Sequence, residues 1–343
     1  MTDILIRTEG RAGRMTLNRP DVLNALSWDM CLEIEKALRI WELDDDVHVV
    51  LIDGAPGRAF CAGGDIQAMH TAGKEQRWEY GQRFWADEYR MNALLFHFPK
   101  PVVAFLHGFT MGGGVGVGCH GSHRVVDDSS RIAMPECGIG LVPDVGGSLL
   151  LARAPGRLGE YLGITGARMD AGDAIYAGFA DYYIPEDWDA LKAELCETGD
   201  VNAVDAAATV APASSFSDRQ EEIDALFSGE TLADIARALD TSNSPLAQDA
   251  RKALARNSPL SMAACVEILH RLGDDPTIEQ AMGLEYRFTA RASEKGDFIE
   301  GIRAQIIDKD RQPKWAHPGP KDVPLADVSA MLRPFPLNLE APK

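Results

Sequence analysis

Two carboxylates in the middle of the chain have the surroundings expected of reacting groups. Glu136 and Asp144 each follow a proline directly, and four glycines between residues 138 and 147 bend the backbone around them. A carboxylate within apolar, glycine-rich sequence is costly to bury without a partner or a purpose. Two such acids could serve as a nucleophile, a base or a proton donor. The segment therefore predicts a reaction site.

A run of three glycines, residues 112–114, precedes the two acids. It follows the apolar residues 102–106, which are typical of a buried strand. Residues without side chains allow a backbone N–H to come close to a ligand atom. A lone glycine more often only permits a tight turn, so the run indicates function only together with the acids that follow it.

The elements around these residues repeat the order strand, glycine loop and helix. Strands are expected at residues 4–7, 14–17, 47–52, 102–106 and 124–126, and helices at residues 28–41 and 75–96. After residue 197 helical periodicity dominates, at residues 219–227, 232–239, 246–255, 261–272 and 278–292. This order predicts an α/β fold with helices packed on sheets.

The same pattern suggests three regions along the chain. We expect a catalytic core over residues 1–196 and a variable helical or linker insertion over residues 197–257. A C-terminal helical region over residues 258–343 would close the site or mediate assembly.

Composition excludes several classes of protein. The 343 residues carry a net charge of −18, which argues against a nucleic-acid binder because phosphate contacts need clustered Lys and Arg. The six cysteines form no C-x-x-C pair, and the histidines show no metal-ligand spacing. No apolar run reaches membrane length, and the first residues lack a basic and then apolar leader. These features predict a cytoplasmic protein with no metal, no nucleic-acid partner and no membrane segment.

Three motifs together resemble the crotonase (enoyl-CoA hydratase/isomerase) superfamily. They are residues 58–65 (RAFCAGGD), the triple glycine, and Met134-Pro135-Glu136 with the glycines that follow it. Further matches, at Glu88-Tyr89, residues 143–147 and residues 296–315, are similar to the acyl-CoA hydrolases of that superfamily. The resemblance covers nearly the whole chain, with residues 197–245 matching least. It implies a crotonase-like fold, in which repeated ββα units form a β-spiral core with surrounding helices, plus a C-terminal helical region.

The resemblance also implies how a CoA thioester would be held. The family's oxyanion hole, a pair of backbone N–H groups aimed at the thioester oxygen, would come from Gly64 and Gly113. Glu88 would lie at the acyl pocket, where it could bind a substrate hydroxyl. The other substrate-binding residues that it implies are Ala62, Asp65, Asn24, Ala25 and Leu26.

Coenzyme A would then be part of the substrate, and no separate cofactor is expected. Its pantetheine and nucleotide are expected along residues 24–26 and 58–64. Lys309 or Arg303 would contribute near the phosphates, although both residues fit surface ion pairs equally well. Members of the superfamily often form trimers, so a homo-oligomer is a further expectation.

The positions of the acids distinguish the hydratases of the superfamily from its hydrolases. Its enoyl-CoA hydratases place one glutamate three residues after the middle glycine and another in the Pro-Glu motif, but here Gly116 occupies the first position. Resemblance to the hydrolases implies that Glu136 attacks the thioester through a mixed anhydride, or activates water. Asp144 would assist hydrolysis or orient the substrate hydroxyl. The expected function is hydrolysis of a short β-hydroxyacyl-CoA, with 3-hydroxyisobutyryl-CoA from valine breakdown as the expected substrate.

Two other functions stay open, namely hydration or isomerisation within the same superfamily, and a non-catalytic role in assembly or RNA binding. The acids also have structural alternatives: Glu136 as a turn carboxylate bonded to amides, Asp144 as an Asx turn, and Glu88 as a solvated ion-pair partner. Residues 116–121 also fit G-x-G-x-x-G, but their strand ends well upstream, so no dinucleotide site is expected.

Overall fold

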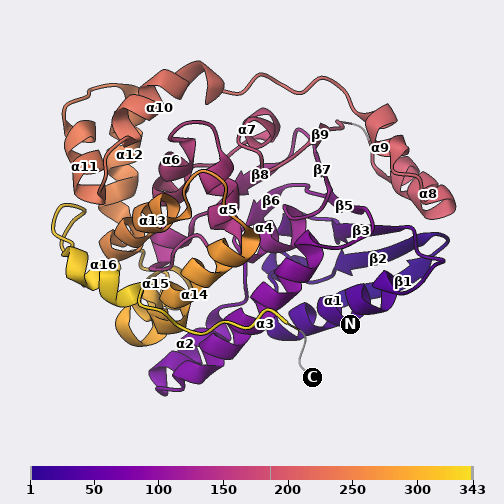
Figure 1. Ribbon diagram of the computed structural model, residues 1–343, viewed down its shortest axis with the longest axis horizontal. Coiled ribbons are helices and arrows are strands. Elements are labelled where there is room, and N and C mark those ends of the chain that lie inside the picture. The colour runs from indigo at the N-terminus through magenta and orange to yellow at the C-terminus, as the bar shows by residue number, and fades with distance from the viewer. Residues whose placement is uncertain (1, 186, 341–343) are drawn as a thin grey trace.

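The computed structural model describes residues 2–185 and 187–340 and shows two sheets surrounded by helices (Figure 1). The larger sheet has the strand order β1-β2-β3-β5-β7-β9, with β1 antiparallel to β2 and the other neighbours parallel. Its strands span Ile4–Glu9, Ala12–Leu17, Val49–Gly54, Val102–Phe105, His123–Val126 and Tyr182–Tyr183. The smaller, parallel sheet holds β4 (Ala59–Cys61), β6 (Phe109–Met111) and β8 (Arg131–Ala133).

The strands of the two sheets alternate along the chain. β3, β5 and β7 of the larger sheet each lead into β4, β6 and β8 of the smaller one, and a helical segment follows each pair. Strand β3 is an unbroken apolar run from Val49 to Ile52 because a parallel sheet is covered on both faces. The predicted α/β fold built from repeated ββα units is therefore confirmed.

Helices make up most of the rest of the described chain. They are α1 (Trp28–Glu42), α2 (Gln67–Lys74), α3 (Trp78–Phe96), α4 (Gly113–Gly118), α5 (Gly147–Arg153), α6 (Leu158–Thr165), α7 (Ala171–Tyr176), α8 (Asp189–Thr198), α9 (Asn202–Ala207), α10 (Gln220–Phe227), α11 (Leu232–Asp240), α12 (Pro245–Arg256), α13 (Pro259–Leu272), α14 (Ile278–Lys295), α15 (Phe298–Ile302) and α16 (Leu325–Met331). Short 3-10 turns at Pro20–Val22, Glu136–Ile139 (η2) and Ser217–Arg219, and a π-helical turn at Arg303–Ile307, complete the set. The five helices expected after residue 197 are α10 to α14.

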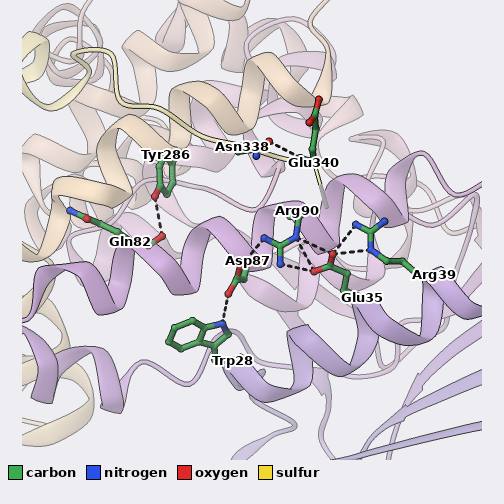
Figure 2. Close-up of polar contacts among 9 residues, drawn as sticks. All are labelled: Trp28, Glu35, Arg39, Gln82, Asp87, Arg90, Tyr286, Asn338 and Glu340. Carbon is green, nitrogen blue, oxygen red and sulfur yellow. Dashed lines mark hydrogen bonds and ion pairs between the residues drawn. The ribbon is translucent and has the colours of Figure 1, made fainter. Parts of the chain in front are cut away.

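Helix α3 is fixed against α1 by a buried ion network (Figure 2). Arg90 of α3 contacts Glu35 of α1 at 2.7 Å and Asp87 at 2.7 Å, and Arg39 contacts the same Glu35 carboxylate at 2.8 Å. Asp87 also accepts a hydrogen bond from the indole N–H of Trp28 at 2.8 Å. These contacts set the rotation of α3 about its own axis, and this rotation decides where the other polar face of the helix points.

The helices of the C-terminal half share the core of the sheets. The largest cluster of buried apolar side chains includes Ile52 of β3, Phe227 of α10 and Phe288 of α14. Helix α14 packs on α3, and α13 packs on α6. The division of the chain near residues 196 and 257 stays a prediction. Among the described residues, no helix is both long enough and apolar enough to cross a membrane.

Candidate active site

A cavity of about 750 Å³ lies between α3, the glycine segment and residues of the C-terminal helices. The predicted site residues that line it are Ala62, Gly64, Glu88, Gly113, Glu136 and Asp144. A larger cavity of about 1040 Å³, between α3, α14 and residues 334–340, contains none of them. The smaller cavity is therefore the candidate site, because the predicted site residues line it.

The triple glycine begins helix α4 and leaves its backbone donors free. Gly112 has φ 51° and ψ −121°, a conformation that glycine adopts without the strain of a side chain. Gly113 is the first helical residue, so its N–H has no acceptor within the helix. Within the described chain we find no hydrogen bond from this N–H or from the N–H of Gly64. A Cβ placed on Gly113 would lie 3.3 Å from the Gly64 nitrogen, so the two free donors are close together, as an oxyanion hole would require.

The carboxylates of two glutamates lie beside these glycines. A Cβ on Gly112 would lie 2.9 Å from Oε1 of Glu136, and a Cβ on Gly113 would lie 3.0 Å from Oε1 of Glu88. A side chain at either position would press on a carboxylate. The close approach puts both acids beside the free N–H groups.

Glu136 has an unoccupied carboxylate oxygen. It begins η2 directly after Pro135, and it is only 4 % exposed. Its Oε2 atom has no hydrogen-bond partner in the described structure. Burial, followed by the charges of Asp144 and Glu285, raises the pKa of Glu136 well above its usual value. Because Oε2 is not held by a backbone amide, it remains available to a substrate.

Asp144 and Glu88 are also buried acids rather than surface charges. The Tyr89 hydroxyl donates a hydrogen bond to Oδ2 of Asp144 at 2.9 Å. Burial and the charge of Glu285 raise the pKa of Asp144 to about 8, although the Tyr89 hydrogen bond opposes the shift. Burial and the charge of Asp144 raise the pKa of Glu88 well above its usual value. Glu88 is 2 % exposed, so its alternative role as a solvated ion-pair partner is wrong.

Packing leaves no room at position 116 for the glutamate that hydratases of the family carry there. A Cβ on Gly116 would lie 2.8 Å from Nδ2 of Asn92 and 2.8 Å from Cβ of Val145. Asn92 is fully buried, and neither its Oδ1 nor its Nδ2 has a hydrogen-bond partner among residues 2–185 and 187–340. A glutamate at position 116 would collide with both neighbours. The sequence analysis did not identify Asn92. Its position four residues after Glu88, on the same face of a helix, could have indicated that it lies near the site.

Some of the predicted substrate-binding residues support the site from outside. Those that do not line the cavity are Asn24, Ala25, Leu26 and Asp65. The Asn24 side-chain amide donates to the carbonyl oxygen of Ala59 at 2.9 Å, and the Leu26 N–H donates to the carbonyl oxygen of Gly63 at 2.9 Å. These bonds hold the loop that presents Gly64.

The positive charges near the cavity differ from those expected. Arg303 contacts Glu300, Asp308 and Asp310 at 2.7 to 2.8 Å, so its charge is already neutralised and the ion-pair alternative fits it. Lys309 does not line the cavity. Three other arginines line it and take part in no ion pair of the described chain: Arg168, Arg256 and Arg311. Sequence reasoning missed them because they come from three distant segments.

A fourth buried acid lies behind Asp144. Glu285 of α14 is fully buried, and burial raises its pKa to about 7 although hydrogen bonds from Ser148 and Gly146 oppose the shift. Sequence reasoning missed this residue too. Its signal was an acid on the buried face of an amphipathic helix, next to Met282 and Phe288.

Comparison with known proteins gives matches along nearly the whole chain. Residues 12–332 match a family model described as enoyl-CoA hydratase/isomerase. The protein named 3-hydroxyisobutyryl-CoA hydrolase, mitochondrial, of Rattus norvegicus is 38 % identical, over 96 % of this chain and 89 % of that protein. The protein of the same name from Homo sapiens is 35 % identical, over 95 % of this chain and 87 % of that protein.

Solved structures are similar over the same extent. A crystal structure of an enoyl-CoA hydratase from Rhodobacter sphaeroides 2.4.1 is 54 % identical, with a TM-score of 0.94 over 97 % of this chain and 98 % of that one. A crystal structure of a carnitinyl-CoA dehydratase from Mycobacterium thermoresistibile is 41 % identical, with a TM-score of 0.93 over 98 % of each chain. The family match and these relatives show that the chain belongs to the enoyl-CoA hydratase/isomerase (crotonase) family.

Proposed function

We propose that this chain hydrolyses the thioester of a short β-hydroxyacyl-CoA, with 3-hydroxyisobutyryl-CoA as the first candidate substrate. The observation that carries the proposal is the buried, unpartnered oxygen of Glu136 beside the free N–H groups of Gly64 and Gly113. A nucleophile or base next to an oxyanion hole is the arrangement that acyl transfer needs. The relatives named 3-hydroxyisobutyryl-CoA hydrolase support the choice of substrate.

In the first step, the thioester oxygen would accept hydrogen bonds from the N–H groups of Gly64 and Gly113. An oxygen of Glu136 then forms a bond to the carbonyl carbon, and the tetrahedral oxyanion is stabilised by the two donors. Collapse breaks the C–S bond and expels the CoA thiolate, which takes a proton from a buried acid. The acyl group is left as a mixed anhydride on Glu136.

In the second step, water attacks the acyl carbon and gives its proton to a carboxylate. The anhydride C–O bond breaks, which releases the hydroxy acid and restores Glu136. Asp144 suits the proton transfers because its pKa of about 8 lies close to neutrality, where an acid both gives and takes a proton readily. In the alternative, Glu136 removes a proton from water, which attacks the thioester directly.

The remaining cavity residues suggest how the rest of the substrate would bind. Glu88 lies beside Gly113 and would exchange a hydrogen bond with the β-hydroxyl of the acyl group. Arg168, Arg256 and Arg311 would provide the local positive charge that CoA phosphates need in a chain of net charge −18. The guanidinium of Arg168 already lies 5.4 Å from the ring centroid of Phe109.

Hydration is the second candidate, because the similar structure that is 54 % identical carries the name enoyl-CoA hydratase. Gly116 and the side chains packed against it argue against this reaction, since they leave no second carboxylate there. Parallel incubation with crotonyl-CoA and 3-hydroxyisobutyryl-CoA decides between the two. We expect thiol release from the hydroxyacyl substrate and no loss of enoyl absorbance. Robust hydration with negligible thiol release would overturn the proposal.

A chemical trap separates the two roles of Glu136. Hydroxylamine added during turnover converts the glutamyl carbonyl of an anhydride into a hydroxamate, which peptide mass spectrometry detects at Glu136. A general base gives no such modification. A single turnover in heavy-oxygen water shows which carbon of the anhydride the water attacks. Attack on the acyl carbon leaves the Glu136 oxygens unlabelled.

We also propose a cytoplasmic location and a homo-oligomeric assembly. The six cysteines are all free thiols in the structure, which fits the expected cytoplasmic location, whereas the relatives named above are mitochondrial proteins. Cell fractionation tests the location, and sedimentation tests the expected homo-oligomer.

A further inference from the structure

Asp144 is followed by a turn that its sequence does not favour. Val145 has φ 54° and Gly146 has φ 77°, so two successive residues lie in the left-handed region. Glycine adopts this region freely, but a β-branched residue there is a rare and strained exception. Such conformations persist only where surrounding contacts hold them, and they cluster at functional sites.

The contacts that hold this turn come mainly from Glu285 of α14. Its Oε2 accepts the N–H of Gly146 at 2.9 Å. Its Oε1 accepts the N–H of Ser148 at 3.0 Å and the Ser148 hydroxyl at 2.5 Å. The carbonyl oxygen of Val145 lies 2.7 Å from Nε2 of His120, whose pKa burial lowers to about 4, so the ring is neutral and donates. Glu285 thus fixes the residues on the far side of the strained turn.

A second residue of α14 reaches the carboxylate of Asp144 through a tyrosine. Thr289 lies one helical turn after Glu285, and its Oγ1 is 3.4 Å from the Tyr89 hydroxyl. That hydroxyl carries a single proton, which it donates to Asp144 at 2.9 Å. It is therefore left to accept a hydrogen bond from Thr289. One face of α14 contacts both the backbone beyond Asp144 and the donor to its side chain.

Helix α14 is itself tied to α3, so the two helices form one support (Figure 2). The Tyr286 hydroxyl donates to the carbonyl oxygen of Gln82 at 3.0 Å, and the Gln82 side chain donates to the carbonyl oxygen of Ala290 at 3.1 Å. The bonded residues of α14, Tyr286 and Ala290, directly follow Glu285 and Thr289 in the sequence. Movement of α14 away from α3 would carry the contacts to the turn with it.

We propose that Glu285 is a positioning residue of the catalytic site: with Thr289 it holds the strained turn at residues 145–146 and so fixes the Asp144 carboxylate. The inference rests on the proposed function, in which Asp144 transfers protons. Glu285 does not line the cavity, so it would act through the backbone of the turn and through its charge. The C-terminal helices are then part of the site.

The groups that face Asp144 define what a pH experiment would report. They are Glu88 and Tyr89 from α3, Glu136 from η2, Glu285 and Thr289 from α14, and His120 through the carbonyl of Val145. Only Glu285 both bonds to the turn and adds its negative charge to the shift of Asp144. Its replacement by a neutral amide should therefore lower the pKa of Asp144 from about 8.

The test compares Glu285→Gln with a matched buried carboxylate elsewhere. Asp173 accepts hydrogen bonds from the Ser214 hydroxyl at 2.8 Å and the Phe216 N–H at 3.3 Å, and it does not line the cavity. At equal folded fraction, we expect E285Q to lower kcat by about 10- to 100-fold with little change in KM, as for small misplacements of reacting groups. Asp173→Asn should leave kcat unchanged. Thr289→Val should lower it by about fivefold, the scale of one hydrogen bond.

Two further readouts would not move if Glu285 were merely structural. Val145→Gly in the E285Q background should restore much of the lost kcat, because glycine adopts the left-handed turn without the hydrogen bonds from Glu285. Carboxyl carbon NMR should show Asp144 titrating at lower pH in E285Q than in the wild type. An E285Q loss equal to that of D173N, no rescue by V145G, or an unmoved Asp144 titration would each overturn the proposal. The NMR arm needs no turnover, so a wild type without thiol release would remove the proposed function and leave this test intact.

Discussion

Helix α3 carries two groups of charged residues, and the protein treats them in opposite ways. On the α1 side, Arg90 and Arg39 hold the pKa of Glu35 below its usual value although burial opposes this (Figure 2). On the cavity side, burial and the charge of Asp144 raise the pKa of Glu88 well above its usual value. Glu88 and Arg90 are only two residues apart, which turns their side chains about 200° around the helix axis.

Under the proposed function, the difference separates a structural acid from a reactive one. Glu35 is paired with Arg39 and Arg90, which stabilise its ionised form. The pKa values of Glu88, Glu136 and Asp144 are shifted by burial and by neighbouring acids, and no Arg or Lys of the described chain lowers them, so ionising these groups is costly. Under the proposed function, these are the acids that react or transfer protons.

The largest expected effect is that of Glu136→Gln. An amide neither attacks a thioester nor removes a proton, so we expect thiol release to fall by roughly 10⁴-fold or more, on the scale of a lost nucleophile. The melting temperature should stay level or rise, because an uncompensated buried acid has been removed. Thiol release and calorimetry measure the two effects. Retained turnover would show that Glu136 is no more reactive than Glu35.

Gly113→Val tests the donors beside the acids. The new Cβ would lie 3.0 Å from Oε1 of Glu88 and 3.3 Å from the Gly64 nitrogen, which disturbs the oxyanion hole. We expect kcat to fall by about 10²–10³, the usual scale for one lost donor. The control is Gly283→Ala in α14, where a Cβ would meet nothing within 4 Å. A folded G113V variant with wild-type turnover would place the oxyanion hole elsewhere.

Glu35→Gln tests the other face of α3. The change leaves the buried Arg90 without its main partner, so the free energy of unfolding should fall by about 3 kcal/mol, at the low end for a broken buried pair because Asp87 remains. Urea titration measures the loss. The kcat of the folded fraction should not change. A changed kcat would mean that the ion network also positions Glu88, and the two faces would no longer be independent.

The two faces should also show a pH dependence of stability of opposite sign. The folded-state pKa values of Asp144 and Glu285 are raised to about 8 and about 7, so their contribution to stability is complete below about pH 4 and is lost as the pH rises through these values. The folded-state pKa of Glu35 is lowered, so its contribution is present above about pH 4 and is lost as the pH falls.

Urea titrations at several pH values measure this contrast. Asp144→Asn should flatten the fall in stability between about pH 5 and pH 8, and Glu35→Gln should leave that range unchanged. Equal slopes in the wild type and D144N would show that Asp144 is not destabilised by burial. Asp144→Asn should also slow turnover while it spares CoA binding.

Residues that act through local motifs were predictable from the sequence. Gly113, Glu136 and Asp144 lie within one stretch rich in glycine and proline, and the family resemblance implied that they share a site. The repeated ββα units were implied by the family resemblance, and the alternation of strand and helix already favoured an α/β fold. Such signals depend on neighbours along the chain.

Residues that act across the fold were not predictable. The Gly146 N–H bonds to a carboxylate 139 residues further on, and no periodicity links the two. Asn92 owes its place to the packing of α3 against α4, which depends on the ion network with α1. Arg303 shows the converse case: Asp308 and Asp310, which neutralise it, lie within seven residues and were visible in the sequence.

The late place of α14 in the chain bears on how the protein is made. Synthesis proceeds at about 5–20 residues per second, so the segment with Glu136 and Asp144 leaves the ribosome roughly ten seconds before Glu285 follows. During that interval the nascent chain carries Glu136 and Asp144 without the helix that contacts the turn after Asp144. A chain that stops short of residue 278 would contain the three motifs shared with the superfamily and would still lack the helix that carries Glu285.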